Sequence, residues 1–237
     1  MRNRRSRRLI CRVRVAVRQM LQCSMASRAM ISNRRRGFTL IELVIVCGVI
    51  GILSSVAVPI FFQYQSRARQ AEAKSQLKSW YNTEASVFAE RGNYFETMAD
   101  SGFVPGRGNR YQYMFSSSCS YEIRAGLNPT STPLDSCVTV DQFRFPGLAL
   151  TPTPIDSTFA YSGPQTNPAT PAGLGGICPN CAIRGMAAGN IDNETHGVDT
   201  WVISSKDAVV TPTTCGSSDT AAPAGMPFNT FNDATCD

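Results

Sequence analysis

The first 37 residues contain no acidic side chain and no lysine, yet they hold 12 arginines. The remainder of the chain carries 11 basic against 17 acidic side chains, so loss of this segment would change the formal net charge from +6 to −6. A positive charge confined to one terminus gives little support to nucleic-acid binding by the rest, and we expect no specific nucleic-acid partner. The arginines end at Arg34, Arg35 and Arg36, directly before an apolar run. The positive-inside rule places such a cluster on the cytoplasmic side of a membrane.

Charge is also scarce from Phe38 to Ser66, where Glu42 is the only charged side chain. Residues 43–62 are nearly all apolar, Gly or Ser, and a bilayer core needs roughly 20 helical residues. The segment has no Ala-x-Ala site of the kind that ends an ordinary secretory signal. We therefore predict that the hydrophobic stretch is retained and that residues 38–62 span a membrane as a helix.

Glu42 lies inside this apolar zone, where an ionised carboxylate costs about 3 kcal/mol and usually has a partner. Cleavage between Gly37 and Phe38 would create an α-amino group four residues away, about one helical turn. The same amine on a neighbouring copy of the chain would serve equally well. The position of Glu42 therefore favours a processed amino terminus.

The string Gly37-Phe38-Thr39-Leu40-Ile41-Glu42 resembles the processing site of type IV prepilins and pseudopilins. The resemblance implies that residues 1–37 are a leader removed by a prepilin peptidase, and that the same enzyme methylates the new amino terminus at Phe38. It assigns Glu42 to pairing with the amino terminus of an adjacent subunit during assembly. It also implies a helix kink, which we expect at Pro59, where a backbone donor is missing. Met30 is an alternative translation start to Met1 and would leave a compact leader.

Beyond Pro59 the pattern is that of an amphipathic helix, which we place at residues 63–91. Its apolar stripe has helical spacing and consists of Ala68, Ala71, Leu77, Trp80, Tyr81, Ala85 and Phe88. Charged residues, Glu72 and Glu84 among them, are predicted on the opposite side, and Gly92 is a stop signal. We interpret the stripe as a face buried against a sheet rather than as an electron-conducting aromatic stack.

Residues 92–237 are rich in Gly, Pro, Ser, Thr and Asn and are predicted to form a globular head. Short runs typical of strands occur at residues 110–115, 121–125, 142–145, 159–161 and 201–204. Residues 130–135 and 146–176 are predicted loops. A long helix packed on an antiparallel sheet with long loops makes the expected fold class α+β, and the resemblance implies the type IV pilin fold.

Nine cysteines are unevenly distributed: Cys11 and Cys23 precede Gly37, Cys47 lies in the apolar segment, and six lie in the head. An even number in an exported domain indicates disulfides. Six cysteines allow fifteen pairings, among which proximity favours Cys119 with Cys137, Cys178 with Cys181, and Cys215 with Cys236. The Cys178-Pro-Asn-Cys181 spacing also suits a redox dithiol or half of a zinc site. The chain lacks a second close Cys or His pair and a thioredoxin-like pattern, and its single histidine is His196.

Oxygen-bearing side chains gather at Asp192, Asn193, Glu194 and Asp199, and such groups could hold calcium. The spacing is not that of an EF-hand, and a metal-free polar turn is the preferred interpretation. No cofactor is therefore expected, with calcium kept as an alternative.

Several head motifs resemble those of the large major pilins of gliding myxobacteria, among them residues 108–113, 178–181, 192–194, 201–203 and 229–233. The resemblance implies a non-enzymatic structural protein, the major subunit of a type IVa pilus used for surface motility and adhesion. It implies an inner-membrane precursor, partnership with the pilus assembly machinery, and polymerisation into an extracellular homo-oligomeric helical filament. The alternatives are a minor pilin, a type II secretion pseudopilin, or a membrane-anchored redox or metal protein using Cys178 and Cys181.

Overall fold

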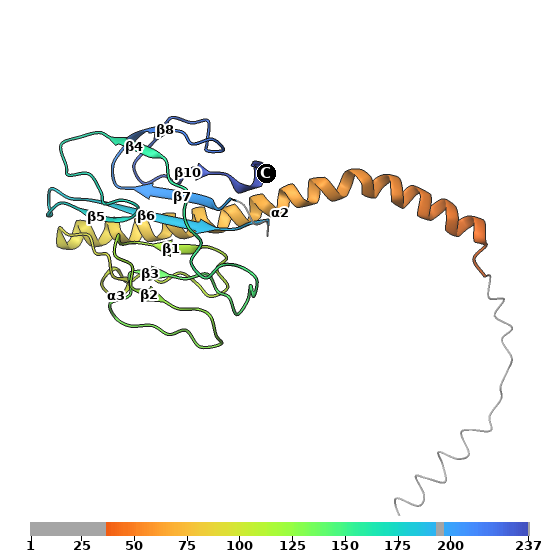
Figure 1. The fold of residues 1–237 in the computed structure, drawn as a ribbon, viewed down its shortest axis with the longest axis horizontal. Coiled ribbons are helices and arrows are strands. Elements are labelled where there is room, and N and C mark those ends of the chain that lie inside the picture. Colours follow the sequence, from red (N-terminus) through yellow and green to blue (C-terminus); the bar gives the residue numbers. More distant parts are fainter. Residues whose placement is uncertain (1–36, 193–196, 237) are drawn as a thin grey trace, which may run out of the picture. The chain divides into compact units, whose positions relative to one another are not determined.

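A computed structural model describes residues 37–192 and 197–236 of the chain (Figure 1). The arginine-rich segment 1–36, Met30 included, and residues 193–196 lie outside the described residues. The chain divides into two compact units, one ending at Ile52 and the other beginning at Leu53.

The long helix α2 runs from Leu40 to Arg91 and contains Pro59. It confirms the sequence prediction of one helix through the apolar and amphipathic segments. It ends where Gly92 adopts a left-handed φ of 71° and donates its backbone N–H to the carbonyl of Phe88 at 2.8 Å. Glycine occupies such a position without a Cβ penalty, which is why it commonly ends helices.

The head adds a short helix and ten strands. Their bounds are α3 Met98–Ser101, β1 Gln112–Met114, β2 Tyr121–Glu122, β3 Cys137–Val138, β4 Thr158–Tyr161, β5 Gly173–Gly175, β6 Ala182–Gly189, β7 Asp199–Ser204, β8 Ala208–Thr211, β9 Ala221–Ala222 and β10 Phe228–Phe231, followed by the 3₁₀ helix η2 Asp233–Thr235. One sheet has the order β10-β7-β6-β1-β3-β2, with β5 also paired to β6, and a second has the order β4-β8-β9.

The pairing is antiparallel throughout the β10-to-β3 path and in the smaller sheet. The pair β2 and β3 is parallel, with Tyr121 opposite Cys137. The prediction of an antiparallel sheet is thus correct for most of the head and wrong at this edge. The α+β class is confirmed, since the later part of α2, in the unit that begins at Leu53, lies along one face of the larger sheet (Figure 1).

The main core lies between α2 and that face. The buried residues of α2 follow a spacing of three and four and are Gln70, Ala73, Leu77, Trp80 and Glu84. The Trp80 ring stacks on Phe115 with centroids 4.7 Å apart. Gly185 of β6 sits beneath the same ring, where a Cβ would collide with it. The other face of the sheet contributes Met114, Met186 and Val202 to a second cluster, against which Phe159 of β4 packs.

The predicted helical stripe is wrong in detail. Ala68 and Ala71 are exposed, whereas Glu84, predicted on the solvent side, is fully buried. Glu72 is also drawn in, because its carboxylate accepts the backbone N–H of Arg110 at 3.0 Å. Polar side chains lie on the packed face because the head supplies hydrogen-bond partners for them, which a hydropathy pattern does not register.

The strand predicted at residues 142–145 is a turn. Its cause is Asp141, whose backbone carbonyl accepts from the N–H of Phe145 at 2.9 Å and whose carboxylate accepts from the N–H of Gly108 at 2.9 Å. The strand predicted at residues 159–161 is confirmed as β4, whereas β5 was not predicted and lies within the predicted loop 146–176. The longest strand, β6, was not predicted, because its Ala and Gly residues have low strand propensity, although Gly185 leaves room for the Trp80 ring.

Candidate functional site

The first described residues form a short segment ahead of α2. Gly37, Phe38 and Thr39 are non-helical and exposed, and the side chain of Phe38 is 88% accessible. A Cβ placed on Gly37 would meet no atom of the described residues within 4 Å, and its φ is not in the left-handed region. Within the described ranges, neither packing nor backbone conformation therefore requires glycine at this position.

Thr39 and Glu42 form a reciprocal cap at the start of α2. The carboxylate Oε2 of Glu42 accepts the backbone N–H of Thr39 at 2.9 Å and its hydroxyl at 2.8 Å. The N–H of Glu42 donates to Thr39 Oγ1 at 3.3 Å. This is a capping box, in which an N-cap Thr and a Glu three residues later satisfy two otherwise unpaired donors. The Thr-x-x-Glu pattern of a capping box is present at positions 39–42, although no helix cap was predicted there.

Glu42 is surrounded along α2 by exposed apolar side chains. Leu40, Ile41, Leu43 and their successors to Phe62 are largely uncovered. Within the described residues no ion pair involves Glu42. In the same ranges, α2 is the one helix long and apolar enough to cross a membrane. A single carboxylate on a bare apolar helix surface is chemically suited to pair with a cation that arrives with another apolar helix.

Pro59 lies within α2, in the unit that begins at Leu53. The helix assignment is unbroken through it. The expected kink at Pro59 stays a prediction.

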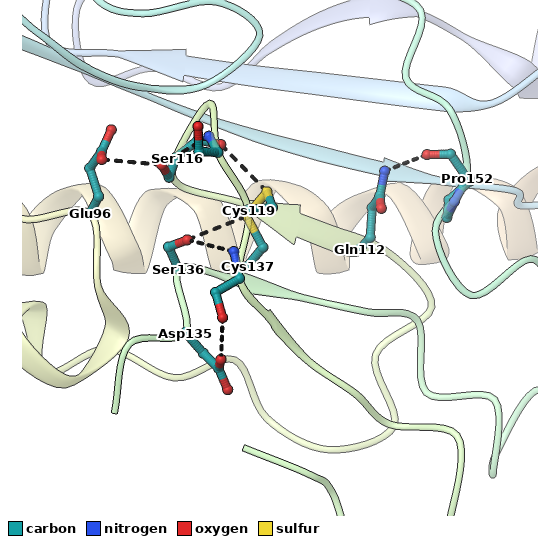
Figure 2. The surroundings of a disulfide bond; sticks show 10 residues. Glu96, Gln112, Ser116, Cys119, Asp135, Ser136, Cys137 and Pro152 are labelled. Carbon is teal, nitrogen blue, oxygen red and sulfur yellow. Dashed lines mark hydrogen bonds between the residues drawn. A yellow bond between two sulfur atoms is a disulfide. The ribbon is translucent and has the colours of Figure 1, made fainter. Parts of the chain in front are cut away.

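The six cysteines of the head are joined as Cys119–Cys137, Cys178–Cys181 and Cys215–Cys236, with Cα separations of 5.4, 4.6 and 5.8 Å. These are the pairs that proximity favours. Figure 2 shows the first of them, which ties the segment after β1 to the first residue of β3, close to Ser116 and Ser136. The third closes a loop that contains β9 and β10.

Cys178 and Cys181 lie in the loop between β5 and β6. No group of three or more His, Cys, Asp or Glu side chains in the part of the chain that the structure describes is arranged to hold a metal ion. His196, the single histidine, lies outside the described residues. The described geometry thus provides a disulfide at this motif and no further zinc ligand beside it.

Asp199, one of the four candidate calcium ligands, is fully buried at the start of β7. Its Oδ2 accepts from the Tyr111 hydroxyl and the Trp201 indole N–H, both at 2.6 Å. Its Oδ1 accepts from Gln70 Nε2 at 2.9 Å and Asn229 Nδ2 at 3.3 Å. All of its ordinary acceptor positions are occupied, so Asp199 serves as a structural hub. Asn193 and Glu194 lie outside the described residues, and Asp192 lies at their edge.

The hub determines the electrostatics of this part of the core. Burial raises the pKa of Asp199 despite the four donors, which each act to lower it. Burial, together with the Asp199 charge, raises the pKa of Tyr111 far above its ordinary value. Tyr111 therefore stays a hydrogen-bond donor at any physiological pH, and the hub links α2, the residue before β1, β7 and β10.

Comparison with known proteins finds a matching family model for the apolar start of the chain and another for the head. Residues 64–198 match the family model described as type IV pilin PilA, and residues 32–58 match the model described as prokaryotic N-terminal methylation motif. The chain is 38% identical over 211 residues to the type IV major pilin protein PilA of Myxococcus xanthus, covering 86% of this chain and 94% of the relative.

Shorter matches reach more distant pilins. A fimbrial protein of Moraxella nonliquefaciens is 39% identical over 69 residues, 29% of this chain and 44% of the relative. The type IV major pilin protein PilE1 of Neisseria gonorrhoeae is 34% identical over 68 residues, 29% of this chain and 41% of the relative.

Three findings lead to one assignment. They are the capped apolar helix, the α+β head packed on the later part of that helix, and a family match that spans most of the head. This chain belongs to the type IV pilin family.

Proposed function

We propose that this chain is the major structural subunit of a type IVa pilus. The similar Myxococcus xanthus protein is named a major pilin and is matched over nearly its whole length. The family assignment supports a structural subunit of a filament, made from a precursor that is processed at its amino terminus. Motility and adhesion are the uses that the family implies.

The observation that carries the assembly mechanism is the isolated carboxylate of Glu42 on the exposed apolar surface of α2. Apolar helices that leave the bilayer for a filament core bury this surface against one another. In that apolar core an unpaired Glu42 carboxylate is costly, whereas a carboxylate paired with a cation can be retained. A neighbouring α-amino group at Phe38 supplies the cation, and because the pair forms at one axial offset, it fixes the register between subunits.

Cleavage of the precursor would create the α-amino group at Phe38 on which this pairing depends. A prepilin peptidase on the cytoplasmic face would cut between Gly37 and Phe38, leaving the arginine-rich leader behind, and would methylate Phe38. The exposed, non-helical segment 37–39 suits a peptidase. No contact among the described residues calls for glycine at position 37, which favours recognition of Gly37 by another protein. The precursor would reside in the inner membrane and the mature subunit in an extracellular pilus.

The test is complementation of a pilin-deleted host with the wild-type chain, Glu42→Gln and the control Glu90→Gln. Glu90 is an exposed carboxylate on the same helix, outside the apolar stretch. We expect abundant wild-type and Glu90→Gln protein in sheared filaments, and Glu42→Gln protein that is processed but stays with the membrane. Normal filaments from Glu42→Gln would contradict the register role. A wild-type chain found only in trace amounts in filaments would identify a minor pilin instead.

A further inference from the structure

Glu84 is a buried acid that the assembly mechanism does not use. It lies on the packed stripe of α2, one turn after Trp80, and is 0% exposed. Its Oε2 accepts the backbone N–H of Phe95 at 3.1 Å. Its Oε1 has no hydrogen-bond partner within the described residues.

The partner segment, residues 92–97, folds back from the end of α2 over this carboxyl. Tyr94 stacks on Phe88 of the helix, with ring centroids 4.3 Å apart. At the far end of the segment, Glu96 accepts the N–H of Leu174 at 2.7 Å and the hydroxyl of Ser116 at 3.1 Å (Figure 2). The contact of Phe95 with Glu84 is thus the polar link between the middle of this segment and α2.

The surroundings of Glu84 provide no counter-charge. None of the ion pairs among the described residues involves it. Arg91, at the end of α2, lies over the Phe95 ring, with Cζ 5.8 Å from the centroid, and Glu96 is engaged by Leu174 and Ser116. Tyr81 on α2 and Tyr94 on the segment are titratable neighbours, and burial raises the pKa of both phenols, so both stay neutral. Lys206 and Asp207, which follow β7, line a pocket with Tyr94, and the Lys206 ammonium donates to the carbonyl of Gln165 at 2.6 Å.

Burial in these surroundings raises the pKa of Glu84 to about 7, and the Phe95 N–H lowers it only in part. An ionised buried carboxylate with one hydrogen bond costs more than a neutral carboxyl, because burial penalises the charged form.

We propose that Glu84 and the backbone of Phe95 form a proton-dependent clasp, which fastens residues 92–97 to α2 while the Glu84 carboxyl is neutral and loosens when it ionises. The clasp belongs to the head itself, so its test does not depend on filament assembly.

The direction of the effect follows from proton linkage. When the segment opens, Glu84 is hydrated and its pKa returns to the ordinary value of about 4.3. The closed form holds its proton to about pH 7. Closure is therefore strongest below about pH 4, weakens by up to about tenfold per pH unit between the two values, and levels off above pH 7. A neutral glutamine at this position removes that dependence.

The experiment is hydrogen exchange on the full chain in detergent micelles, following the amide of Phe95. After correction for intrinsic exchange, we expect its protection to fall by at least about tenfold from about pH 5 to about pH 7. The control Glu90→Gln should show the same fall, whereas Glu84→Gln should show none. Constant protection in the wild-type chain, or an equal fall in Glu84→Gln, would overturn the clasp.

A second measurement guards against a Glu84→Gln chain that does not fold. Carbon-13 NMR of labelled Glu carboxyl carbons in the wild-type chain should show one titration with a midpoint near 7. If every glutamate of the folded chain titrates below about pH 5, Glu84 is not the proton-binding group and the proposal is wrong.

Discussion

Glu42 accepts two hydrogen bonds from Thr39, one from the backbone N–H at 2.9 Å and one from the hydroxyl at 2.8 Å. The residue that the family resemblance assigns to subunit pairing is therefore also the residue that closes the first turn of α2. The two roles are compatible, because a carboxylate has about four acceptor sites and Thr39 uses part of them. Thr39 partly satisfies the charge of Glu42 in a single subunit.

The cap leads to a prediction for Thr39→Val, which removes the hydroxyl and keeps the side-chain shape. Loss of an N-cap oxygen costs about 1 kcal/mol, or about fivefold in local opening. We expect faster amide exchange at Glu42 in micelles, with exchange in the head unchanged. Thr39→Ser, which retains a capping hydroxyl, is the control. Equal exchange in the two variants would mean that the cap does not hold the helix start.

Gly185 is predicted to be intolerant of any side chain. A Cβ there would collide with the Trp80 ring, and overpacking of a core costs about 1 to 3 kcal/mol. Gly185→Ala should lower the free energy of unfolding of the full chain by that amount in denaturant titrations. Gly147→Ala, at a position with open space and no left-handed φ, is the matched control and should have little effect. A Gly185→Ala chain as stable as this control would contradict the packing described.

Asp199→Asn tests the hub. Whichever way the new amide is oriented, its NH₂ group faces two donors, because Tyr111 and Trp201 meet one oxygen and Gln70 and Asn229 the other. Leaving buried donors unpaired costs about 1 to 3 kcal/mol. We expect a clear fall in thermal midpoint for Asp199→Asn and almost none for Asp219→Asn, an exposed aspartate. Similar midpoints for both variants would show that the hub is dispensable.

The disulfides should differ in how much each contributes to the free energy of unfolding. In the chain-entropy model a longer closed loop constrains the unfolded chain more. Replacing Cys215 and Cys236, 21 residues apart, by serine should cost about 3 kcal/mol, against about 2 kcal/mol for Cys178 and Cys181, 3 residues apart. Calorimetry of the two double variants compares them, and the reverse order would argue against this assignment of their roles.

Thiol titration of the wild-type chain addresses the redox alternative. The mature chain from Phe38 should present Cys47 as its free thiol in the native state. Two further reactive thiols assigned to Cys178 and Cys181 would favour a redox dithiol over a structural disulfide.

The sequence predicted well what depends on contiguous residues. The apolar run predicted the first part of α2, and the string from Gly37 to Glu42 lies at its start as expected. Cysteines that are near in sequence are joined in the structure. Local patterns succeed here because each feature depends on residues that are contiguous or near one another in the sequence, at most 21 residues apart for the disulfides.

Features that depend on distant partners were not predictable. β6 is composed largely of Ala and Gly, which have low strand propensity, and its Gly185 leaves room for the ring of Trp80, about 100 residues earlier in the chain. Glu84 lies on the packed face because the backbone of Phe95 meets it there, and a backbone donor leaves no trace in composition. Asp199 was predicted as a possible metal ligand because three of its four donors, Gln70, Tyr111 and Asn229, are distant in the sequence.

We predict that this pilin is cut between Gly37 and Phe38 and is then methylated at the new amino terminus. Mass spectrometry of the chain purified from sheared filaments measures this directly. We expect an amino-terminal peptide that begins at Phe38 and carries one added methyl group on its α-nitrogen. A chain that retains residues upstream of Phe38, or that begins at another position, would contradict the account.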